Sequence, residues 1–541
     1  MENPSQRQSV TQLLKRSAQQ ECNRVAAIDD SSGSSITWSE MLERVQRLAG
    51  GLKNALSLSA GARVAILSNN SNRYIESYFG LPWAGLLVVP LNTRLAPPEI
   101  VEILNDAEVE AVFADADFMK ILGPIESQLP PTFKRFVFLG ETSETPAGSV
   151  SYESLIAEND PIDDLSAGGD DVYGLFYTGG TTGKPKGVML THGSIIMNAM
   201  GNVVTASYDN SSRYLHCAPM FHLADASMIF AVSMVGGTHV SIPKFTPPDT
   251  LRALQAHKVN KVVLVPVMIQ FCLGMPNASS FDLTALQTII YGGSPMAGSI
   301  LQLAMKHFPN ASFVQGYGMT ECGPAISTLA AAYHVIGNEK LGSAGKPVYF
   351  AQVKIVDEND NEVPRGKVGE VIVRGPHVMK GYWKMPEASE KALRGGWMHT
   401  GDGGYMDEDG FIYIKDRIKD MIITGGENVY SAEVEAAVVS FPGVALCAVI
   451  GTPDEKYGEL VTAVLQLKPD VDKSGVTLEA LKAHCKAKIA GYKCPRKLVI
   501  KDKLPVSGPG KILKHEIRKE FWSGHEQEGL YGSGNTKTTY T

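Results

Sequence analysis

Hydrophobic and polar positions alternate in blocks over roughly the first 340 residues. Short apolar runs at 62–67, 88–92 and 110–115 predict buried strands. The stretches at 71–85 and 97–107 have the apolar spacing of helices, and the second opens with two prolines. Strands that alternate with helices predict crossover connections on mostly parallel sheets, so we expect an α/β fold.

The pattern of predicted strands, turns and helices changes twice after this region. From about 341 to 417, short strands alternate with Asp/Asn/Gly turns, which predicts a small β-barrel-like unit. Residues 418–525 mix helix-like and strand-like runs and predict a compact α+β domain of ordinary size. Residues 526–541 are polar and glycine-rich, and we expect a flexible tail. We therefore predict a large amino-terminal domain of layered sheets and helices, residues 1–417, followed by the smaller domain.

Composition narrows the class of protein. The 541 residues are 44% hydrophobic and 20% charged, which is ordinary for a globular protein. The formal net charge of −7 argues against a dedicated nucleic-acid binder. Seven cysteines include no CxxC pair, so neither a zinc ribbon nor a disulfide framework is expected. The sequence contains no secretory signal, no apolar stretch of membrane-spanning length and no SKL-type terminus, and we expect a cytoplasmic protein.

A glycine- and threonine-rich segment lies at residues 177–192, with the sequence YTGGTTGKPKGVMLTH, directly after an apolar strand. Its glycines free the backbone to curl, so that amides and hydroxyls can converge on an oxyanion. Lys184 and Lys186 add positive charge, which suits a polyphosphate. The segment is not a Walker A motif, because it is one residue short between the glycines and Pro185 follows the first lysine. A flexible Gly/Thr loop is the alternative interpretation.

This segment resembles the phosphate-binding signature of the adenylate-forming superfamily, which includes acyl-CoA synthetases, nonribosomal adenylation domains and luciferases. Four further blocks follow in the order of that superfamily: YGGSP at 291–295, YGMTE at 317–321, HTGD with DRIKDMIITGGENVYSAEVE at 399–435, and GPGKILKHEIR at 508–518. The resemblance implies a two-step reaction. A carboxylate first reacts with ATP to give an acyl-adenylate and pyrophosphate, and the thiol of coenzyme A then displaces AMP.

The resemblance also implies which residues bind the nucleotide. The phosphate loop and the adenine and ribose contacts would comprise Thr178, Gly179, Gly180, Thr181, Thr182, Gly183, Lys184, Lys186, Gly293, Ser294, Tyr317, Gly318, Asp402 and Arg417. Asp402 would accept the ribose hydroxyls, as an acidic residue does in dinucleotide folds. Thr320 would contact phosphate, and Glu321 would ligate Mg²⁺ together with phosphate oxygens and water.

Two further residues are implied to act on the carboxylate. Lys511 would reach the carboxylate and the α phosphate during adenylation. The superfamily usually has a threonine two residues before this lysine, and Pro509 stands there instead, so we expect that hydrogen bond to be lost. His222, in APMFHLAD, matches a position at the mouth of the acyl tunnel, although a lone histidine in an apolar run is often a packed core residue.

The second half-reaction is implied to use the smaller domain differently. Lys419 matches the hinge about which this mobile domain rotates, bringing Gly425, Gly426 and Glu427 to the coenzyme A site. Three basic residues of one short segment are further candidates for the coenzyme A phosphates, with a solvated loop as the alternative: Lys493, Arg496 and Lys497.

We therefore predict an AMP-forming carboxylic acid:CoA ligase, similar to fatty-acyl-CoA synthetases, that uses ATP, Mg²⁺ and coenzyme A. An aryl or cinnamic acid:CoA ligase and an enzyme that loads a carrier protein are the alternatives, and a luciferase-type oxygenase would share every motif. A catalytically inactive scaffold is expected to have lost Lys511, Glu321 or Asp402, and all three are present. A small carboxylic acid is the expected partner besides ATP and coenzyme A, and assembly as a homodimer is left open.

Overall fold

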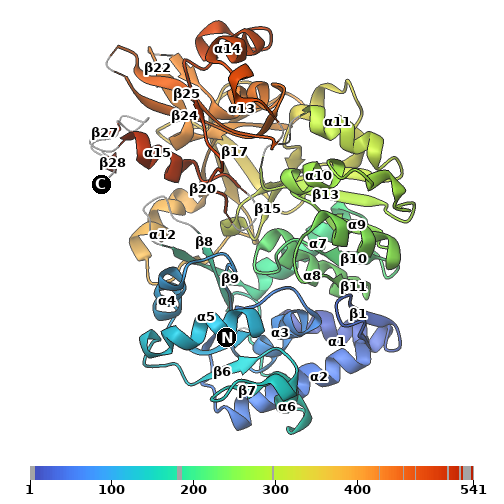
Figure 1. The fold of residues 1–541 in the computed structure, drawn as a ribbon. Helices are drawn as coiled ribbons and strands as arrows, with labels where there is room; N and C mark the ends of the chain where they lie inside the picture. The colour runs from blue at the N-terminus through green and yellow to red at the C-terminus, as the bar shows by residue number, and fades with distance from the viewer. Residues whose placement is uncertain are drawn as a thin grey trace.

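A computed structural model of the protein describes residues 7–178, 185–294, 296, 298–425, 427–454, 456–469, 471–507, 511–522, 526–527 and 538–539. Two large sheets, each flanked by helices, form the amino-terminal part of the molecule. A smaller antiparallel sheet follows, and the orange-to-red carboxyl-terminal elements lie together at the top of Figure 1. The predicted fold class, layered sheets with helices and a smaller α+β unit, is confirmed.

The first large sheet contains eight strands, and its pairs from β8 to β7 are all parallel. In spatial order its strands are β19 (Gly381–Tyr382), β9 (Lys186–Thr191), β8 (Val172–Thr178), β4 (Leu87–Pro90), β3 (Arg63–Leu67), β5 (Val109–Ala114), β6 (Arg135–Phe138) and β7 (Val150–Ser151). The helices of this part of the chain are α2 (Trp38–Gly50), α3 (Asn72–Trp83), α4 (Pro97–Asp106), α5 (Ala116–Ile125) and α6 (Tyr152–Ala157).

The second large sheet contains nine strands, with a parallel centre and antiparallel edges. In spatial order they are β16 (Lys346–Pro347), β15 (Ala325–Leu329), β14 (Ser312–Gly318), β13 (Thr288–Gly292), β12 (Lys261–Val263), β10 (Arg213–His216), β11 (Thr238–Ser241), β1 (Val25–Asp29) and β2 (Ser35–Thr37). Its helices are α1 (Thr11–Gln20), α7 (His192–Thr205), α8 (Leu223–Val235), α9 (Pro247–Ala256), α10 (Pro266–Leu273) and α11 (Gly298–His307).

The remaining sheets carry the later motifs. The four-stranded antiparallel sheet consists of β17 (Gln352–Val356), β18 (Gly369–Arg374), β20 (Met398–Met406) and β21 (Ile412–Arg417), with α12 (Pro386–Ala392) nearby in the chain. The five-stranded sheet consists of β23 (Glu427–Val429), β22 (Ile422–Thr424), β25 (Gly458–Leu467), β24 (Val444–Asp454) and β26 (Lys497–Ile500). Three helices belong to the same part of the chain: α13 (Ser431–Val438), α14 (Leu478–Lys486) and α15 (Lys514–Trp522). A short pair, β27 (Glu526–Gln527) with β28 (Thr538–Thr539), lies within the predicted tail.

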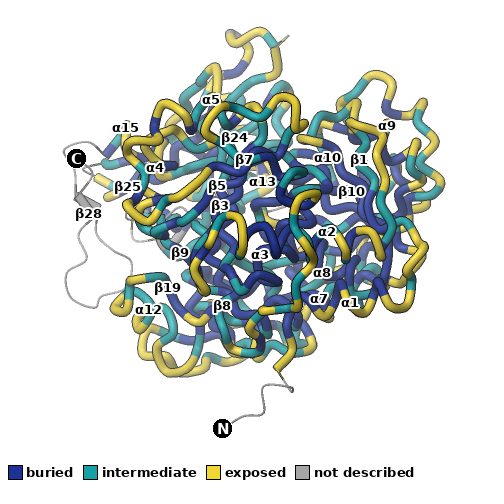
Figure 2. The backbone as a smooth tube through the Cα atoms, turned by 90° about the horizontal axis from the view of Figure 1, so that it is seen from below, coloured by how far each residue is buried: buried dark blue, intermediate teal, exposed yellow. Residues whose placement is uncertain are grey.

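The core lies between the layers, as the dark blue interior of Figure 2 shows. Helix α3 is the clearest case, because all of its residues except Arg73 are buried. The five-stranded sheet has an apolar cluster of its own, built around Val449, Val461 and Leu481. Among the described residues, no helix is long and apolar enough to cross a membrane.

Candidate active site

Two neighbouring strands bring a carboxylate and a guanidinium together at the edge of the small antiparallel sheet. Asp402 on β20 and Arg417 on β21 are opposite each other in register, and Arg417 Nε lies 2.6 Å from Asp402 Oδ1. The Tyr317 hydroxyl, from β14 of the nine-stranded sheet, donates to Asp402 Oδ2 at 2.6 Å. Burial raises the pKa of Asp402, although Arg417 opposes this effect. Three predicted nucleotide residues therefore meet at one point.

Glu321 lies beside them in a short 3-10 turn, Thr320–Cys322, that follows β14. Its side chain is buried, and its Oε1 accepts a hydrogen bond from the Tyr382 hydroxyl at 2.9 Å. The amino group of Lys186 lies 5.0 Å from the centre of the Tyr382 ring. Burial and the Glu321 carboxylate raise the pKa of Tyr382, so its hydroxyl stays protonated and can donate.

Lys511 reaches this cluster from the carboxyl-terminal part of the chain. The methylene next to its amino group passes 3.7 Å from where a Cβ atom on Gly293 would lie. Burial and the nearby charge of Arg417 lower the pKa of Lys511, while Asp402 and Glu321 oppose that shift. The amino group therefore lies within the electrostatic reach of three predicted site residues from two other sheets.

A short hairpin presents Lys511 to the cluster. Val506 and Ile512 form an isolated antiparallel bridge, and the Ser507 amide donates to the Lys511 carbonyl at 2.7 Å. The Lys511 amide in turn donates to the Ser507 hydroxyl at 3.1 Å. Pro509, where a threonine was expected, lies outside the described residues. Ser507 thus supplies a side-chain hydrogen bond to the lysine that the sequence did not predict.

His222 stands at the amino end of α8. Its Nδ1 accepts the amide hydrogen of Ala224 at 3.1 Å, which caps the helix and leaves Nε2 to carry the proton of a neutral ring. Burial and the positive charge of Lys511 lower the pKa of His222 to about 3. The imidazole ring is therefore neutral at physiological pH. It lies within the electrostatic reach of the Lys511 ammonium, as the other residues of the cluster do.

The phosphate segment connects two strands of the eight-stranded sheet. Thr178 ends β8 and Lys186 begins β9, and the two are paired in register. Gly179, Gly180, Thr181, Thr182, Gly183 and Lys184 lie outside the described residues. Gly318 needs to be glycine, because a Cβ atom there would lie 1.8 Å from the carbonyl oxygen of Pro324. Gly293 adopts a φ of +78°, and Ser294 follows it at the carboxyl end of β13.

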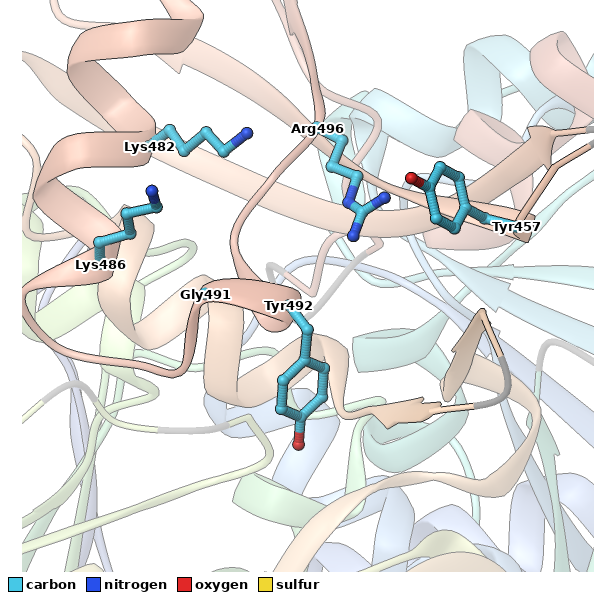
Figure 3. A pocket seen from close by; sticks show the side chains of 6 residues that line it. All are labelled: Tyr457, Lys482, Lys486, Gly491, Tyr492 and Arg496. Carbon is cyan, nitrogen blue, oxygen red and sulfur yellow. The ribbon is translucent and has the colours of Figure 1, made fainter.

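The predicted coenzyme A residues that the structure describes lie in the carboxyl-terminal part of the chain and outside this cluster. Gly425 and Glu427 belong to the β22–β23 turn, while Gly426 and the Lys419 side chain are outside the described residues. The Gly425 amide donates to the Tyr457 carbonyl at 2.8 Å. Tyr457 also lines a surface pocket of about 570 Å³, shown in Figure 3.

That pocket combines positive charge with aromatic rings. Its lining is Tyr457, Lys482, Lys486, Gly491, Tyr492 and Arg496, and the Arg496 guanidinium stacks 4.1 Å from the Tyr457 ring centre. Of the three basic residues predicted for this role, Arg496 alone is among the lining residues. Lys493 instead pairs with Glu433 at 2.7 Å, and Lys497 lies over the Phe521 ring.

Several contacts were not predicted from the sequence. Tyr382, Ser507, Lys482 and Lys486 belong to no motif that separated them from ordinary strand, loop or helix residues. The partners of Tyr382 and Ser507 are between 4 and about 200 residues away in the chain, so only the folded structure shows these contacts.

Comparisons with known proteins identify the family of this chain. The family model for the AMP-binding enzyme matches residues 14–383, and that for the AMP-binding enzyme C-terminal domain matches residues 433–511. A feruloyl-CoA synthase from Amycolatopsis sp is 40% identical over 90% of this chain and 94% of its own. The long-chain-fatty-acid–CoA ligase FadD13 of Mycobacterium tuberculosis is 34% identical over 92% of this chain and 95% of its own. The crystal structure of the anthranilate CoA ligase AuaEII in complex with anthranoyl-AMP superposes with a TM-score of 0.88, at 26% identity, over 95% of this chain and 97% of that one.

The chain therefore belongs to the AMP-binding enzyme family, within the adenylate-forming superfamily. The prediction of an AMP-forming acid–CoA ligase, which uses ATP and coenzyme A as substrates, is confirmed, and the aryl-acid alternative fits as well.

Proposed function

We propose that the cluster around Lys511 is where this enzyme forms an acyl-adenylate from a hydrophobic, preferably aromatic, carboxylic acid. The observation that carries the proposal is the convergence of Lys511, Asp402, Arg417 and Glu321, which come from three different sheets or loops. These residues are up to 190 positions apart in the sequence, and Lys511 is buried among them with a lowered pKa. Perturbed titratable groups that converge in this way are typical of a functional site.

In the first half-reaction, a carboxylate oxygen attacks the α phosphorus of ATP and pyrophosphate leaves. Both reactants are anions, so cationic and hydrogen-bonding groups must offset their repulsion. Lys511 is proposed to place its ammonium between the carboxylate and the α phosphate. Neutral His222 is proposed to face the carboxylate with its Nε2 proton, which adds a donor without adding a second charge to repel Lys511.

The nucleotide is proposed to lie along the ends of β13, β14 and β20. Asp402 would accept the ribose hydroxyls, held in place by Arg417 and by the Tyr317 hydroxyl. Gly293, Ser294 and Gly318 would allow the adenine to approach the backbone closely. Thr178, Thr320, Lys186 and the segment from Gly179 to Lys184 are proposed for the phosphates, because backbone amides, hydroxyls and lysines are the groups that bind them.

The donor set near Glu321 fits Mg²⁺. One oxygen of this carboxylate is engaged by Tyr382, and Mg²⁺ typically takes one or two carboxylates together with substrate phosphates and water. In the described part of the chain, no three His, Cys, Asp or Glu side chains gather into a metal site of their own. Glu321 is therefore the residue proposed to hold the ion, which when bound would neutralise phosphate charge.

In the second half-reaction the thiol of coenzyme A attacks the acyl carbon, and AMP leaves. We propose that the pocket of Figure 3 takes the phosphates and adenine of coenzyme A, since it offers Lys482, Lys486 and Arg496 beside two tyrosine rings. Tyr457 links this pocket to the turn that contains Gly425 and Glu427. Lys419 is proposed as the hinge about which the carboxyl-terminal domain rotates. This rotation would remove Lys511 from the active site and bring the turn with Gly425 and Glu427 to it.

An aromatic acid is the proposed substrate because both the feruloyl-CoA synthase and the anthranilate CoA ligase among the relatives are named for aromatic acids. A fatty acid is the second candidate, favoured by the likeness to FadD13. The proposed boundary between the two domains follows Arg417. The cytoplasmic location, the homodimer and a carrier-protein acceptor stay predictions from the sequence.

Pyrophosphate release across a panel of carboxylates, with and without coenzyme A, tests this proposal. The panel would contain ferulate, cinnamate, benzoate, octanoate and palmitate. We expect the highest kcat/KM with a cinnamate-type acid, and thioester formation only when coenzyme A is present. Higher kcat/KM with the fatty acids would overturn the aromatic assignment, and pyrophosphate release with none of the acids would overturn the proposed function.

A further inference from the structure

A buried carboxylate joins the two parts of the molecule next to the predicted hinge. Asp416 lies on β21, directly before the ribose candidate Arg417, and it is buried. Its Oδ2 accepts hydrogen bonds from the amide and the hydroxyl of Ser431, both at 2.5 Å, and from the Ala432 amide at 3.3 Å. Ser431 is the first residue of α13, so Asp416 caps a helix that belongs to the other domain.

Capping by a carboxylate is electrostatically favourable. The first amides of a helix have no partners within it, and the helix dipole places partial positive charge at this end. Residue 430, which would normally supply the cap, is a tyrosine that makes no side-chain cap to the helix. The amino end of α13 is therefore satisfied by a residue from the amino-terminal domain rather than by its own sequence.

Ser431 also contacts Lys514, which lies in the same segment as Lys511, the proposed adenylation lysine. The amino group of Lys514 donates to the Ser431 hydroxyl at 2.6 Å and pairs with Glu435 at 2.8 Å. Burial alone would lower the pKa of Lys514, but Glu435 and Asp416 outweigh it and raise that pKa, so this lysine remains charged. Lys514 begins α15, three residues after Lys511.

We propose that Asp416 is a positioning residue for adenylation: by holding Ser431 and, through it, Lys514, it keeps Lys511 in the active site. The proposal rests on the two-step function proposed above. Asp416 precedes the hinge candidate Lys419, whereas Ser431 and Lys514 follow it, so rotation of the carboxyl-terminal domain moves the donors away from the carboxylate. Asp416 therefore stabilises the adenylation arrangement and not the arrangement for thioester formation.

A second contact holds the same segment from its other side. Arg94, in the loop between β4 and α4, donates to the Ser507 carbonyl at 2.9 Å. Ser507 is the residue whose hydroxyl accepts the Lys511 amide. Because Arg94 is exposed, its contribution is expected to be smaller than that of the buried Asp416.

The test compares the two half-reactions in the full-length Asp416→Ala and Asp416→Asn variants. Pyrophosphate release measures adenylation, and thioester formation from supplied acyl-adenylate measures the second step. Loss of a buried, charge-assisted contact with several donors predicts roughly a 10- to 100-fold slower adenylation for alanine. Asparagine keeps an acceptor oxygen and is expected to recover part of this rate. Thioester formation is expected to stay within about threefold of the wild-type rate, since the proposed contact is absent in that arrangement.

Glu433→Gln provides the matched control. Glu433 lies on the same helix but pairs with Lys493 inside the carboxyl-terminal domain, so its removal is expected to leave both half-reactions unchanged. Arg94→Gln is expected to slow adenylation less than Asp416→Ala does, and again without slowing the second step.

A distance measurement gives a readout that does not depend on activity. Of the seven cysteines Cys22 is exposed and the other six are buried, so a spin label on Cys22 can be combined with one on Glu479→Cys at the start of α14. We expect Asp416→Ala to broaden or shift the distance distribution between the labels. Equal slowing of both half-reactions, or an unchanged distribution, would overturn the role of Asp416. A wild-type enzyme that adenylates no acid would instead overturn the proposed function, so the two failures are distinguishable.

Discussion

The hydroxyl of Tyr382 offers a sharp test of how Glu321 is held. Tyr382→Phe removes one oxygen atom and keeps the ring that packs beneath Lys186. The hydrogen bond that is lost joins the hydroxyl to Glu321 Oε1 at 2.9 Å in a buried place. The antiparallel pairing of Tyr382 with Val188 fixes the backbone, so the phenylalanine ring is expected to stay in position.

The expected magnitude follows from the kind of bond. A hydrogen bond to a charged group contributes about 1.5–3 kcal/mol. At 1.36 kcal/mol per factor of ten this corresponds to roughly a 10- to 100-fold loss in adenylation if the bond is needed to orient the carboxylate. Groups that orient a metal ligand typically change metal affinity by a similar factor, about 10- to 100-fold. The midpoint of the Mg²⁺ dependence is therefore expected to move to higher concentration.

The assay is pyrophosphate release at saturating ATP over a series of Mg²⁺ concentrations. Tyr173→Phe is the matched control, because Tyr173 is also buried and its hydroxyl donates to the Tyr78 carbonyl at 2.9 Å, in the core of the first sheet. It is expected to lower the melting temperature without shifting the Mg²⁺ midpoint. If Tyr382→Phe slows the reaction equally at every Mg²⁺ concentration, the proposed orientation of Glu321 is wrong.

Four further predictions concern other parts of the site. Lys511→Ala should abolish acyl-adenylate formation and leave thioester formation from supplied acyl-adenylate largely intact; equal loss of both would contradict the assignment. Because burial and Arg417 lower the pKa of Lys511, kcat/KM for ATP should fall with rising pH at a pH below 10.5, the ordinary lysine value, as the ammonium loses its proton, and Lys511→Arg should remove this alkaline limb. Gly318→Ala should destabilise the protein by about 1–3 kcal/mol in chemical denaturation, since its Cβ would lie 1.8 Å from a carbonyl oxygen, whereas Gly298→Ala, with no atom within 4 Å, should be neutral. Arg496→Ala should raise KM for coenzyme A about tenfold and leave KM for ATP unchanged, and an equal change in both would argue against the pocket.

Much of the first part of the fold follows from local pattern. The apolar run at 62–67 forms β3, and the segment with helical spacing at 97–107 forms α4. The spacing of apolar residues indicates which type of element can bury them, and this depends little on what the element packs against. The order of strands in each sheet could not be derived in this way. It places β9 and β19 side by side although they are nearly 200 residues apart, and nothing in either segment specifies the other.

The candidate site likewise contains residues that the sequence predicted and residues that only the folded structure identifies. The motifs around Asp402, Glu321 and Lys511 are contiguous, and the family resemblance that they carry implied their roles in phosphate and carboxylate chemistry. The groups that hold them are isolated residues: Tyr382 on Glu321, and Ser507 on Lys511.

By itself, then, the sequence determined the family and the fold class, because these depend on short-range patterns and contiguous motifs. It also predicted which residues would touch substrate. The tertiary structure decided that Lys511 lies in the cluster, that Arg496 rather than Lys493 lines the basic pocket, and that Asp416 caps α13. The physical reason is that hydrogen bonds and ion pairs depend on distances in space, and those distances are set only when distant segments pack together.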